Sequence, residues 1–208
     1  MPLELWLAFT LASAVLLAIP GPTVMLVVSY AMAHGRQTGW STVPGVALGD
    51  CTAMTISLLG AGAVLAASAT LFTVLKLAGA AYLIWLGIQL WRADPSRAEV
   101  ESMTPPAPTR AMFWHAYAVT ALNPKSIVFF IAFVPQFVSP GRGLLVQFVI
   151  LEVTFVTLAA VNVALWALAA GQLGRWFRSP DVLRLVHRAG GSLLIGAGVL
   201  TAVTRRTA

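Results

Sequence analysis

Long apolar stretches separated by short polar breaks run along almost the whole chain. Read between these breaks, the pattern predicts six helices, over residues 4–33, 39–66, 70–91, 112–138, 143–171 and 189–205. A helix needs about 20 residues to cross a hydrocarbon core about 30 Å thick, so these stretches approach or exceed spanning length. Lipid leaves the backbone groups of an open sheet unpaired, whereas a helix pairs its own. The pattern therefore predicts an all-α integral membrane protein with six transmembrane helices.

A polar segment divides the chain in the middle. Residues 92–111 are rich in charge and proline, as in "RADPSRAEVESMTPPAPTR", and we expect a solvated linker there. The chain, 1–208, then forms a single transmembrane domain with halves 1–91 and 112–208, each of three helices. A short separate helix at the membrane surface is expected in "RSPDVLRLVHR", before the last span.

The two halves share landmarks at an offset of 102 residues. This offset aligns Pro22 with Pro124 and the acidic Asp50 with the acidic Glu152. A proline thus interrupts the first helix of each half, and a carboxylate lies in the second. Because each half has an odd number of helices, the halves would form inverted repeats. Interrupted apolar segments at matching places in inverted halves are typical of a transporter's binding site.

Composition agrees with a membrane protein, since 59% of residues are hydrophobic and only 10% are charged. The net charge of +6 comes mainly from connections beside apolar spans, so no nucleic-acid partner is expected. Eight arginines share one set of alternate connections: Arg36, Arg92, Arg97, Arg110, Arg175, Arg178, Arg184 and Arg188. The other set holds Arg142, Arg205 and Arg206, with Lys76 at a helix edge. The richer set should face the cytoplasm, which places both termini outside.

The cysteine and histidine residues argue against two classes of function. Cys51 is the only cysteine, so an intramolecular disulfide or a paired-cysteine relay enzyme is not expected. His34, His115 and His187 share no ligand spacing with the carboxylates, so we expect neither a metal site nor a cofactor.

The stretch "AIPGPTVML" places Pro20, Gly21 and Pro22 inside an uncharged span. The two prolines lack backbone N–H groups, so carbonyls of the preceding turn lose their partners. Ser13, Thr23 or water could satisfy some of them. The segment is either a tolerated kink or an unwound stretch whose second half-helix points its N-terminus at an anion.

The stretch "ALNPKSIVFF" is the counterpart in the second half. Pro124 breaks the helix, Asn123 can cap the half-helix that follows, and Lys125 places a positive charge in its first turn. Helix-dipole logic disfavours a cation there unless an anion is close. That anion is Asp50 or Glu152 in a permanent pair, or the carboxylate of a substrate, and the sequence leaves the alternatives open.

Two carboxylates lie inside predicted spans. Asp50 is about ten residues into its span, where an unpaired charge costs at least about 2.5 kcal/mol. Gly45 and Gly49 beside it allow another backbone to approach closely. Glu152 is a second candidate for binding a proton or an ammonium group, unless it pairs with Lys125 or lies in a shallower, wetter position.

These motifs together resemble the LysE/RhtB family of bacterial amino-acid exporters. The matching pieces are "PGP" at residues 20–22, "PGVALGD" at 44–50, "KLAGAAYLIWLGIQLWR" at 76–92 and "NPKSIVFFIAFVPQF" at 123–137, followed by the glycine-rich helix from Gly190. The resemblance implies a six-helix exporter in the bacterial plasma (inner) membrane rather than an enzyme. It also implies substrate-binding roles for Pro20, Gly21, Pro22, Asp50, Asn123, Pro124 and Lys125.

We therefore expect a secondary exporter that moves amino acids or close derivatives out of the cell by proton antiport. Asp50 and Glu152 are the proton-coupling candidates. The expected partners are a small amino-acid substrate, protons and the lipid bilayer, and a homo-oligomer stays open. The alternative is a metal-ion exporter, because the wider superfamily includes such proteins.

Overall fold

The computed structural model describes residues 1–92, 108–138, 143–176 and 180–203. All regular structure in these ranges is helical, which confirms the all-α prediction. The elements are α1 (Leu3–Ala18), α2 (Pro22–His34), η1 (Arg36–Thr38), α3 (Gly39–Ala67), α4 (Ala69–Arg92), α5 (Thr109–Ala121), α6 (Pro124–Val128), η3 (Phe129–Phe133), η4 (Val134–Phe137), α7 (Leu144–Trp176) and α8 (Pro180–Val203). The breaks after Ala18 and after Ala121 follow the prolines identified in the sequence.

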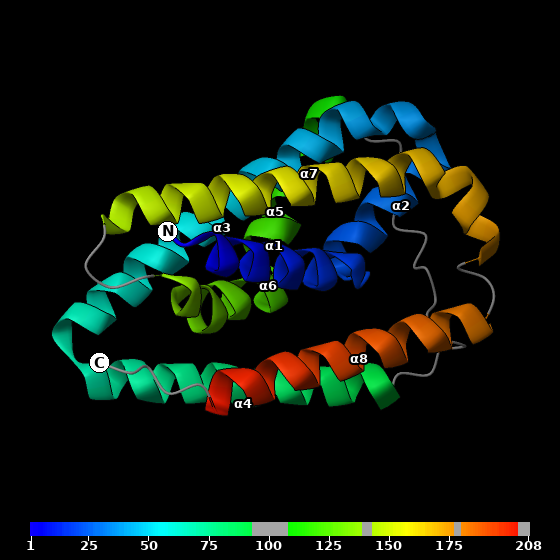
Figure 1. Cartoon of the computed structure of the whole chain (residues 1–208). Helices are drawn as coiled ribbons and strands as arrows, with labels where there is room; N and C mark the ends of the chain where they lie inside the picture. The colour runs from blue at the N-terminus through cyan, green and yellow to red at the C-terminus, as the bar shows by residue number, and fades with distance from the viewer. Residues whose placement is uncertain (93–107, 139–142, 177–179, 204–208) are drawn as a thin grey trace.

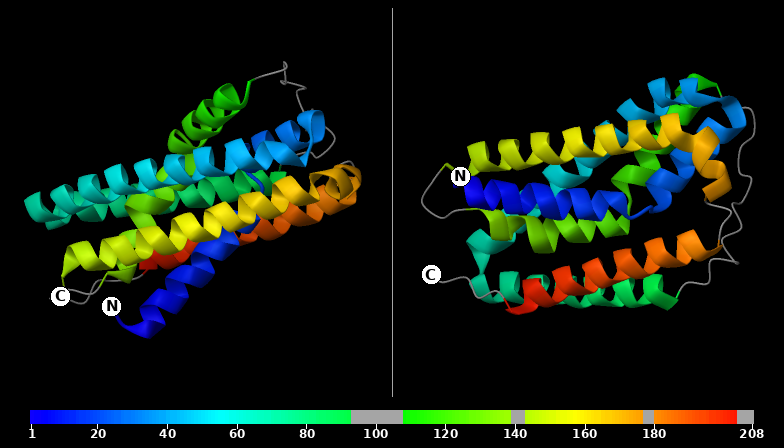
Figure 2. Two further views of the ribbon diagram at one scale, coloured as in Figure 1. Left: turned by 90° about the horizontal axis from the view of Figure 1, so that it is seen from above. Right: turned by 45° about the vertical axis from the view of Figure 1, so that its right-hand side comes forward.

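The helices run back and forth along one bundle (Figure 1). Helices α4 and α8 lie side by side along one edge, while the remaining helices form the main body (Figures 1 and 2). Helix α3 packs against α5, and α7 packs against α1 and α2. Each interrupted segment therefore packs against an uninterrupted helix from the other half of the chain.

Helix α7 is apolar on both its inner and its outer face. Leu151, Phe155 and Ala159 are fully buried at a spacing of four residues, whereas Val161 and Leu165 are more than half exposed. A helix that is hydrophobic all round suits a lipid environment. By length and composition, the spans Arg36–Gly60 and Leu144–Ala170 could cross a membrane, and the described residues give up to four spans if each bent helix pair counts as one. Six spans in two inverted repeats therefore stay a prediction.

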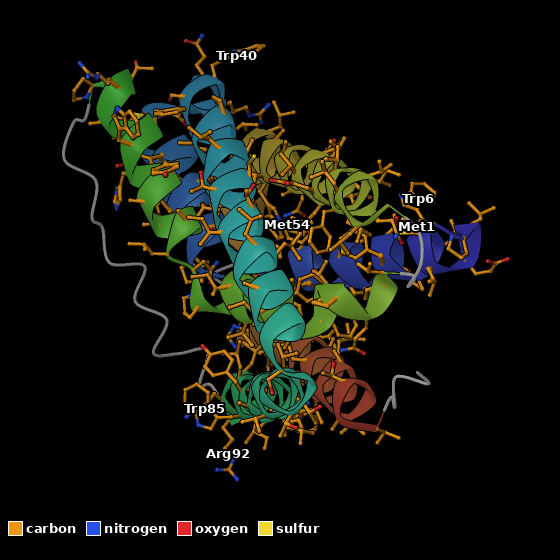
Figure 3. All side chains as sticks on the ribbon, turned by 90° about the vertical axis from the view of Figure 1, so that its left-hand side faces the viewer. Met1, Trp6, Trp40, Met54, Trp85 and Arg92 are labelled. Carbon is orange, nitrogen blue, oxygen red and sulfur yellow. The ribbon has the colours of Figure 1, made fainter. Side chains whose placement is uncertain are left out.

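The side chains at the periphery are consistent with this environment. Figure 3 shows Trp40, Trp85 and Arg92 at the outside of the bundle, and Trp40 is 88% exposed. Met54, by contrast, is fully buried on α3.

Glycines of α3 allow α5 to approach closely. A Cβ added at Gly49 would lie 2.8 Å from Tyr117 O and 2.8 Å from Thr120 Cβ, both on α5. A Cβ at Gly45 would lie 2.5 Å from Phe113 O on the same helix. The expectation that this glycine pair admits another backbone beside Asp50 is thus confirmed.

The stretch 112–138 is broken before Pro124, as predicted, but it then continues as a π-helical turn (η3) and a tight last turn (η4), which were not predicted. The prediction of a separate surface helix is wrong: α8 begins at Pro180 and continues without a break to Val203. Pro180 suits a first helical position, so it starts this long helix itself.

Several predicted features lie outside the described residues. The linker 92–111 is described only at its ends, because residues 93–107 are not covered. The arginines at positions 97, 142, 178, 205 and 206 also lie outside the described residues.

Candidate functional site

The first helix break lies between α1 and α2. Helix α1 ends at Ala18, α2 begins at Pro22, and the two axes differ by 53°. In a continuous helix the carbonyls of Leu16 and Ala18 would accept from the N–H groups of residues 20 and 22, but both are prolines. The break therefore exposes carbonyl oxygens inside the protein, and these need other donors.

The second break lies between α5 and α6. Helix α5 ends at Ala121 and α6 begins at Pro124, with a bend of 42° between α5 and the segment that runs to Phe137. Asn123 Oδ1 accepts a hydrogen bond from the backbone N–H of Lys125 at 3.1 Å. The predicted capping role of Asn123 is thus confirmed.

Side chains from the second half of the chain donate hydrogen bonds to the carbonyl oxygens left unpaired at the first break. Lys125 Nζ donates to Leu16 O at 3.2 Å and to Ile19 O at 3.0 Å. Asn162 Nδ2, on α7, donates to Leu17 O at 3.1 Å. The end of α1 is therefore capped by a lysine and an asparagine that lie more than 100 positions away in the chain.

These contacts show what Lys125 meets in this structure, which is neutral carbonyl oxygens. Within the described ranges, no carboxylate oxygen lies within 4.0 Å of Lys125 Nζ. The lysine meets the negative end of the α1 dipole instead, where carbonyl oxygens gather. The suggestion that Ser13 satisfies these carbonyls is wrong, because its buried hydroxyl has no hydrogen-bond partner in the described part of the chain.

The two breaks also touch each other directly. Thr23, in the first turn of α2, accepts hydrogen bonds from Thr120 Oγ1 at 3.2 Å and from Asn123 Nδ2 at 3.4 Å. A Cβ added at Gly21 would lie 3.3 Å from Lys125 Nζ. Gly21 therefore leaves the space that the lysine head group occupies.

A small polar cavity lies where the breaks meet. Its walls include Gly21, Asp50, Asn123, Lys125 and Asn162. Only 3% of Asp50 is exposed and Lys125 is partly buried, so a buried carboxylate and an ammonium group face one cavity. The cavity volume is about 30 Å³, which admits a water molecule but not an amino acid. One acid and one base in such a site match the two charges of a zwitterion.

The predicted site residues play different parts in this geometry. Gly21, Asp50, Asn123 and Lys125 line the cavity, while the three prolines of the two motifs shape the breaks beside it. Asn162, to which the sequence analysis gave no role, also lines the cavity and bonds the end of α1. Its spacing from the motifs gave no signal of its place in the wall.

Glu152 lies outside the cavity, in the contact between α7 and α3. Its Oε1 accepts hydrogen bonds from Thr55 Oγ1 and, at 3.2 Å, from Cys51 Sγ. The residue is partly buried. The structure therefore does not bring the two carboxylates of the aligned halves into one polar site.

His115 takes part in a link between helices. Its Nδ1 is hydrogen-bonded to the Tyr30 hydroxyl at 2.8 Å, which joins α5 to α2.

No group of three or more His, Cys, Asp or Glu side chains gathers as a metal site in the part of the chain that the structure describes.

Comparison with known proteins gives consistent matches over almost the full length. The family model of the LysE type translocator matches residues 14–205. An uncharacterized membrane protein of Vibrio cholerae is 34% identical over 99% of this chain and 100% of its own length. A homoserine/homoserine lactone efflux protein of Salmonella typhimurium is 33% identical over 99% of both chains. A leucine efflux protein of Klebsiella pneumoniae is 28% identical over 71% of this chain and 72% of its own. No solved structure matches the chain at a significant level.

Proposed function

Because the chain belongs to the LysE family of translocators, we propose that it is a secondary exporter of amino acids or close derivatives. Members of this family are transporters rather than enzymes. The relatives named for homoserine and leucine efflux support an amino-acid substrate. The observation that carries the proposal is the buried cavity at the two helix breaks, with Asp50 and Lys125 in its walls.

We assign the two charged groups of the substrate to opposite charges of the cavity. The substrate carboxylate binds Lys125, and the N-termini of α2 and α6 favour an anion at the same place. The substrate ammonium group binds the Asp50 carboxylate. Asn123 and Asn162 supply the neutral hydrogen-bonding groups that fix its orientation.

Binding and conformational change are coupled through Lys125 in this proposal. The cavity of about 30 Å³ has to widen before an amino acid fits. A substrate carboxylate that takes the Lys125 ammonium releases the carbonyls of Leu16 and Ile19, which frees the end of α1 to move. This exchange of partners by Lys125 couples substrate binding to the rocking of the two halves, and so to alternating access.

We propose proton antiport, with Asp50 as the main coupling group. A proton and a substrate ammonium group both neutralise this buried carboxylate, so they compete for it. Glu152 is the second candidate, acting from the contact between α3 and α7.

The proposed topology has six spans in two inverted repeats within the bacterial inner membrane. In support, each interrupted segment packs against an uninterrupted helix of the other half. Arg36 lies between α2 and α3, Arg92 at the end of α4, and Arg184 and Arg188 near the start of α8. These element ends lie toward one end of the bundle (Figure 1), which we assign to the cytoplasm, with both termini outside.

Export from proteoliposomes loaded with labelled leucine or homoserine tests the proposal. We expect Asp50→Asn and Lys125→Ala to abolish export at equal protein abundance. Asp181→Asn and Arg184→Ala are matched controls, because these residues form an exposed ion pair on α8. Unchanged export in both site variants rules out the assigned site.

The driving ion is tested in the same vesicles. Export that ignores an imposed pH gradient contradicts proton antiport but leaves amino-acid export standing. Efflux of metal ions without efflux of any amino acid favours the metal-exporter alternative.

A further inference from the structure

An apolar groove lies between α1 and α8, beside the polar cavity. One face of α1 forms its first wall, with Leu11, Ala12 and Val15 among the lining residues. Leu194 of α8 and Phe129 of η3 close the other sides. Its volume is about 300 Å³, roughly ten times that of the polar cavity, and every lining residue is apolar.

The groove and the polar cavity share part of their walls. Leu16 and Ile19 line both, and the carbonyls of these two residues bind Lys125. The last turn of α1 therefore separates the ammonium group of the site from the apolar groove. A molecule with a charged head and an apolar tail would reach both compartments once this turn moves.

We infer that the groove holds the apolar side chain of the exported molecule while its head group lies between Lys125 and Asp50. The inference rests on the proposed export function and names the substrate class as amino acids with long aliphatic side chains. The polar cavity alone is too small for such a side chain, whereas about 300 Å³ is in the range of small-molecule sites.

The same turn of α1 forms the barrier between the compartments. The side chain of Ile19 packs on α8, where a Cβ added at Gly190 would lie 2.9 Å from Ile19 Cγ1. Ile19 is followed directly by Pro20, at the break itself. Release of the Ile19 carbonyl by Lys125 and withdrawal of the Ile19 side chain from α8 are therefore parts of one movement.

A lipid tail is the rival occupant, because the groove opens on the outer side of the bundle. Leu11 is 68% exposed and Leu193 is 46% exposed at its rim. The groove is continuous with the charged cavity, which favours the substrate as occupant, since a lipid tail needs no link to an acid and a base. If the substrate side chain fills the groove, export should depend on the length of that side chain. If a lipid tail fills the groove, export should not depend on it.

Each methylene of a substrate side chain that enters the groove should increase affinity about fourfold, from about 0.8 kcal/mol per buried CH₂. The experiment compares alanine, 2-aminobutyrate, norvaline and norleucine as competitors of labelled leucine export from proteoliposomes. Leak from protein-free vesicles is subtracted for each compound. We expect half-maximal inhibition at about fourfold lower concentration for each added methylene.

Two substitutions in α1 test where the side chain of the exported amino acid binds. Ala12→Phe fills the groove, and Ala14→Phe is the matched control on the exposed face of the same helix. We expect Ala12→Phe to lose the advantage of norleucine over alanine while alanine export continues, and Ala14→Phe to keep it. If Ala12→Phe does not insert into membranes, the wild-type series still decides.

The outcomes separate this inference from the export proposal. Equal inhibition by all four compounds in an active exporter overturns the inference and indicates a lipid-filled groove. A steep series that Ala12→Phe leaves unchanged also overturns it, because the side chain then lies elsewhere. Export of no amino acid by the wild type refutes both proposals.

Discussion

Removal of the Asn162 amide tests how the broken end of α1 is stabilised. Asn162 Nδ2 donates to Leu17 O at 3.1 Å, across the contact between α7 and α1. In Asn162→Leu the side chain keeps a similar size but has no donor, so the Leu17 carbonyl loses this bond. The perturbation removes no charge, which separates hydrogen bonding from the cost of burying an ion.

Two estimates set the size of the effect. A buried acceptor left unsatisfied costs about 1–3 kcal/mol in soluble proteins. Interhelical hydrogen bonds in a membrane protein average about 0.6 kcal/mol and reach about 1.7, because the unfolded chain in lipid also finds partners. The membrane range governs here, so we expect a loss of about 0.6–1.7 kcal/mol, or about threefold to seventeenfold in the folding equilibrium.

The assay is unfolding in mixed micelles by titration with SDS, followed by circular dichroism. Asn162→Ala serves as a second variant, and the loss shared by both variants measures the hydrogen bond. Thr52→Val is a matched control, since its hydroxyl bonds Leu48 O of its own helix. Ser13→Ala should cost nothing or stabilise the protein, because this buried hydroxyl has no partner among the described residues.

The reasoning is refuted if both Asn162 variants unfold at the same SDS fraction as the wild type. It is also refuted if Ser13→Ala destabilises the protein as strongly as Asn162→Leu. The first result would mean that the end of α1 does not depend on donors from the second half, and the second would mean that the Ser13 hydroxyl contributes a bond comparable to that of Asn162.

Two further predictions follow from helix packing and from the separation of the carboxylates. Gly49→Leu should lower the free energy of unfolding by about 1–3 kcal/mol in the same titration, because α5 lies against Gly49. Gly60→Leu on the same helix meets open space and should change little; equal effects would contradict the packing argument. Glu152→Gln should keep amino-acid counterflow without a pH gradient, whereas Asp50→Asn should lose it, because Glu152 lies outside the cavity. Loss of counterflow in both variants would place Glu152 in the binding site.

The sequence predicted the helices and their breaks because these depend on local chemistry. Apolar runs of spanning length predicted α3 and α7 closely, and missing N–H groups located the interruptions at Pro20 and Pro124. The capping role of Asn123 also followed from local rules. Pro180 misled the prediction, because a proline at a first helical position fits the start of a surface helix and of a span equally well.

The partners within the site could not be predicted, because they depend on which helix faces meet. Lys125 was expected to meet a carboxylate, but the carbonyls of Leu16 and Ile19 lie closer. Asn162 reaches the same helix end from a helix with no motif of its own. Glu152 aligns with Asp50 in the repeat yet points to Thr55 instead of the cavity. Spacing along the chain carries no information on these contacts.

Protection of a cavity residue by substrate tests the central claim most directly. Ser126 lines the cavity and is 6% exposed, so Ser126→Cys is a nearly isosteric probe in a Cys51→Ser background. Ser192→Cys is the control, since Ser192 lies exposed on α8. We expect the exported amino acid, at ten times its Kd, to slow thiol labelling at position 126 about tenfold and to leave position 192 unchanged. Equal labelling rates at position 126 with and without that amino acid, in protein that exports it, would contradict the account.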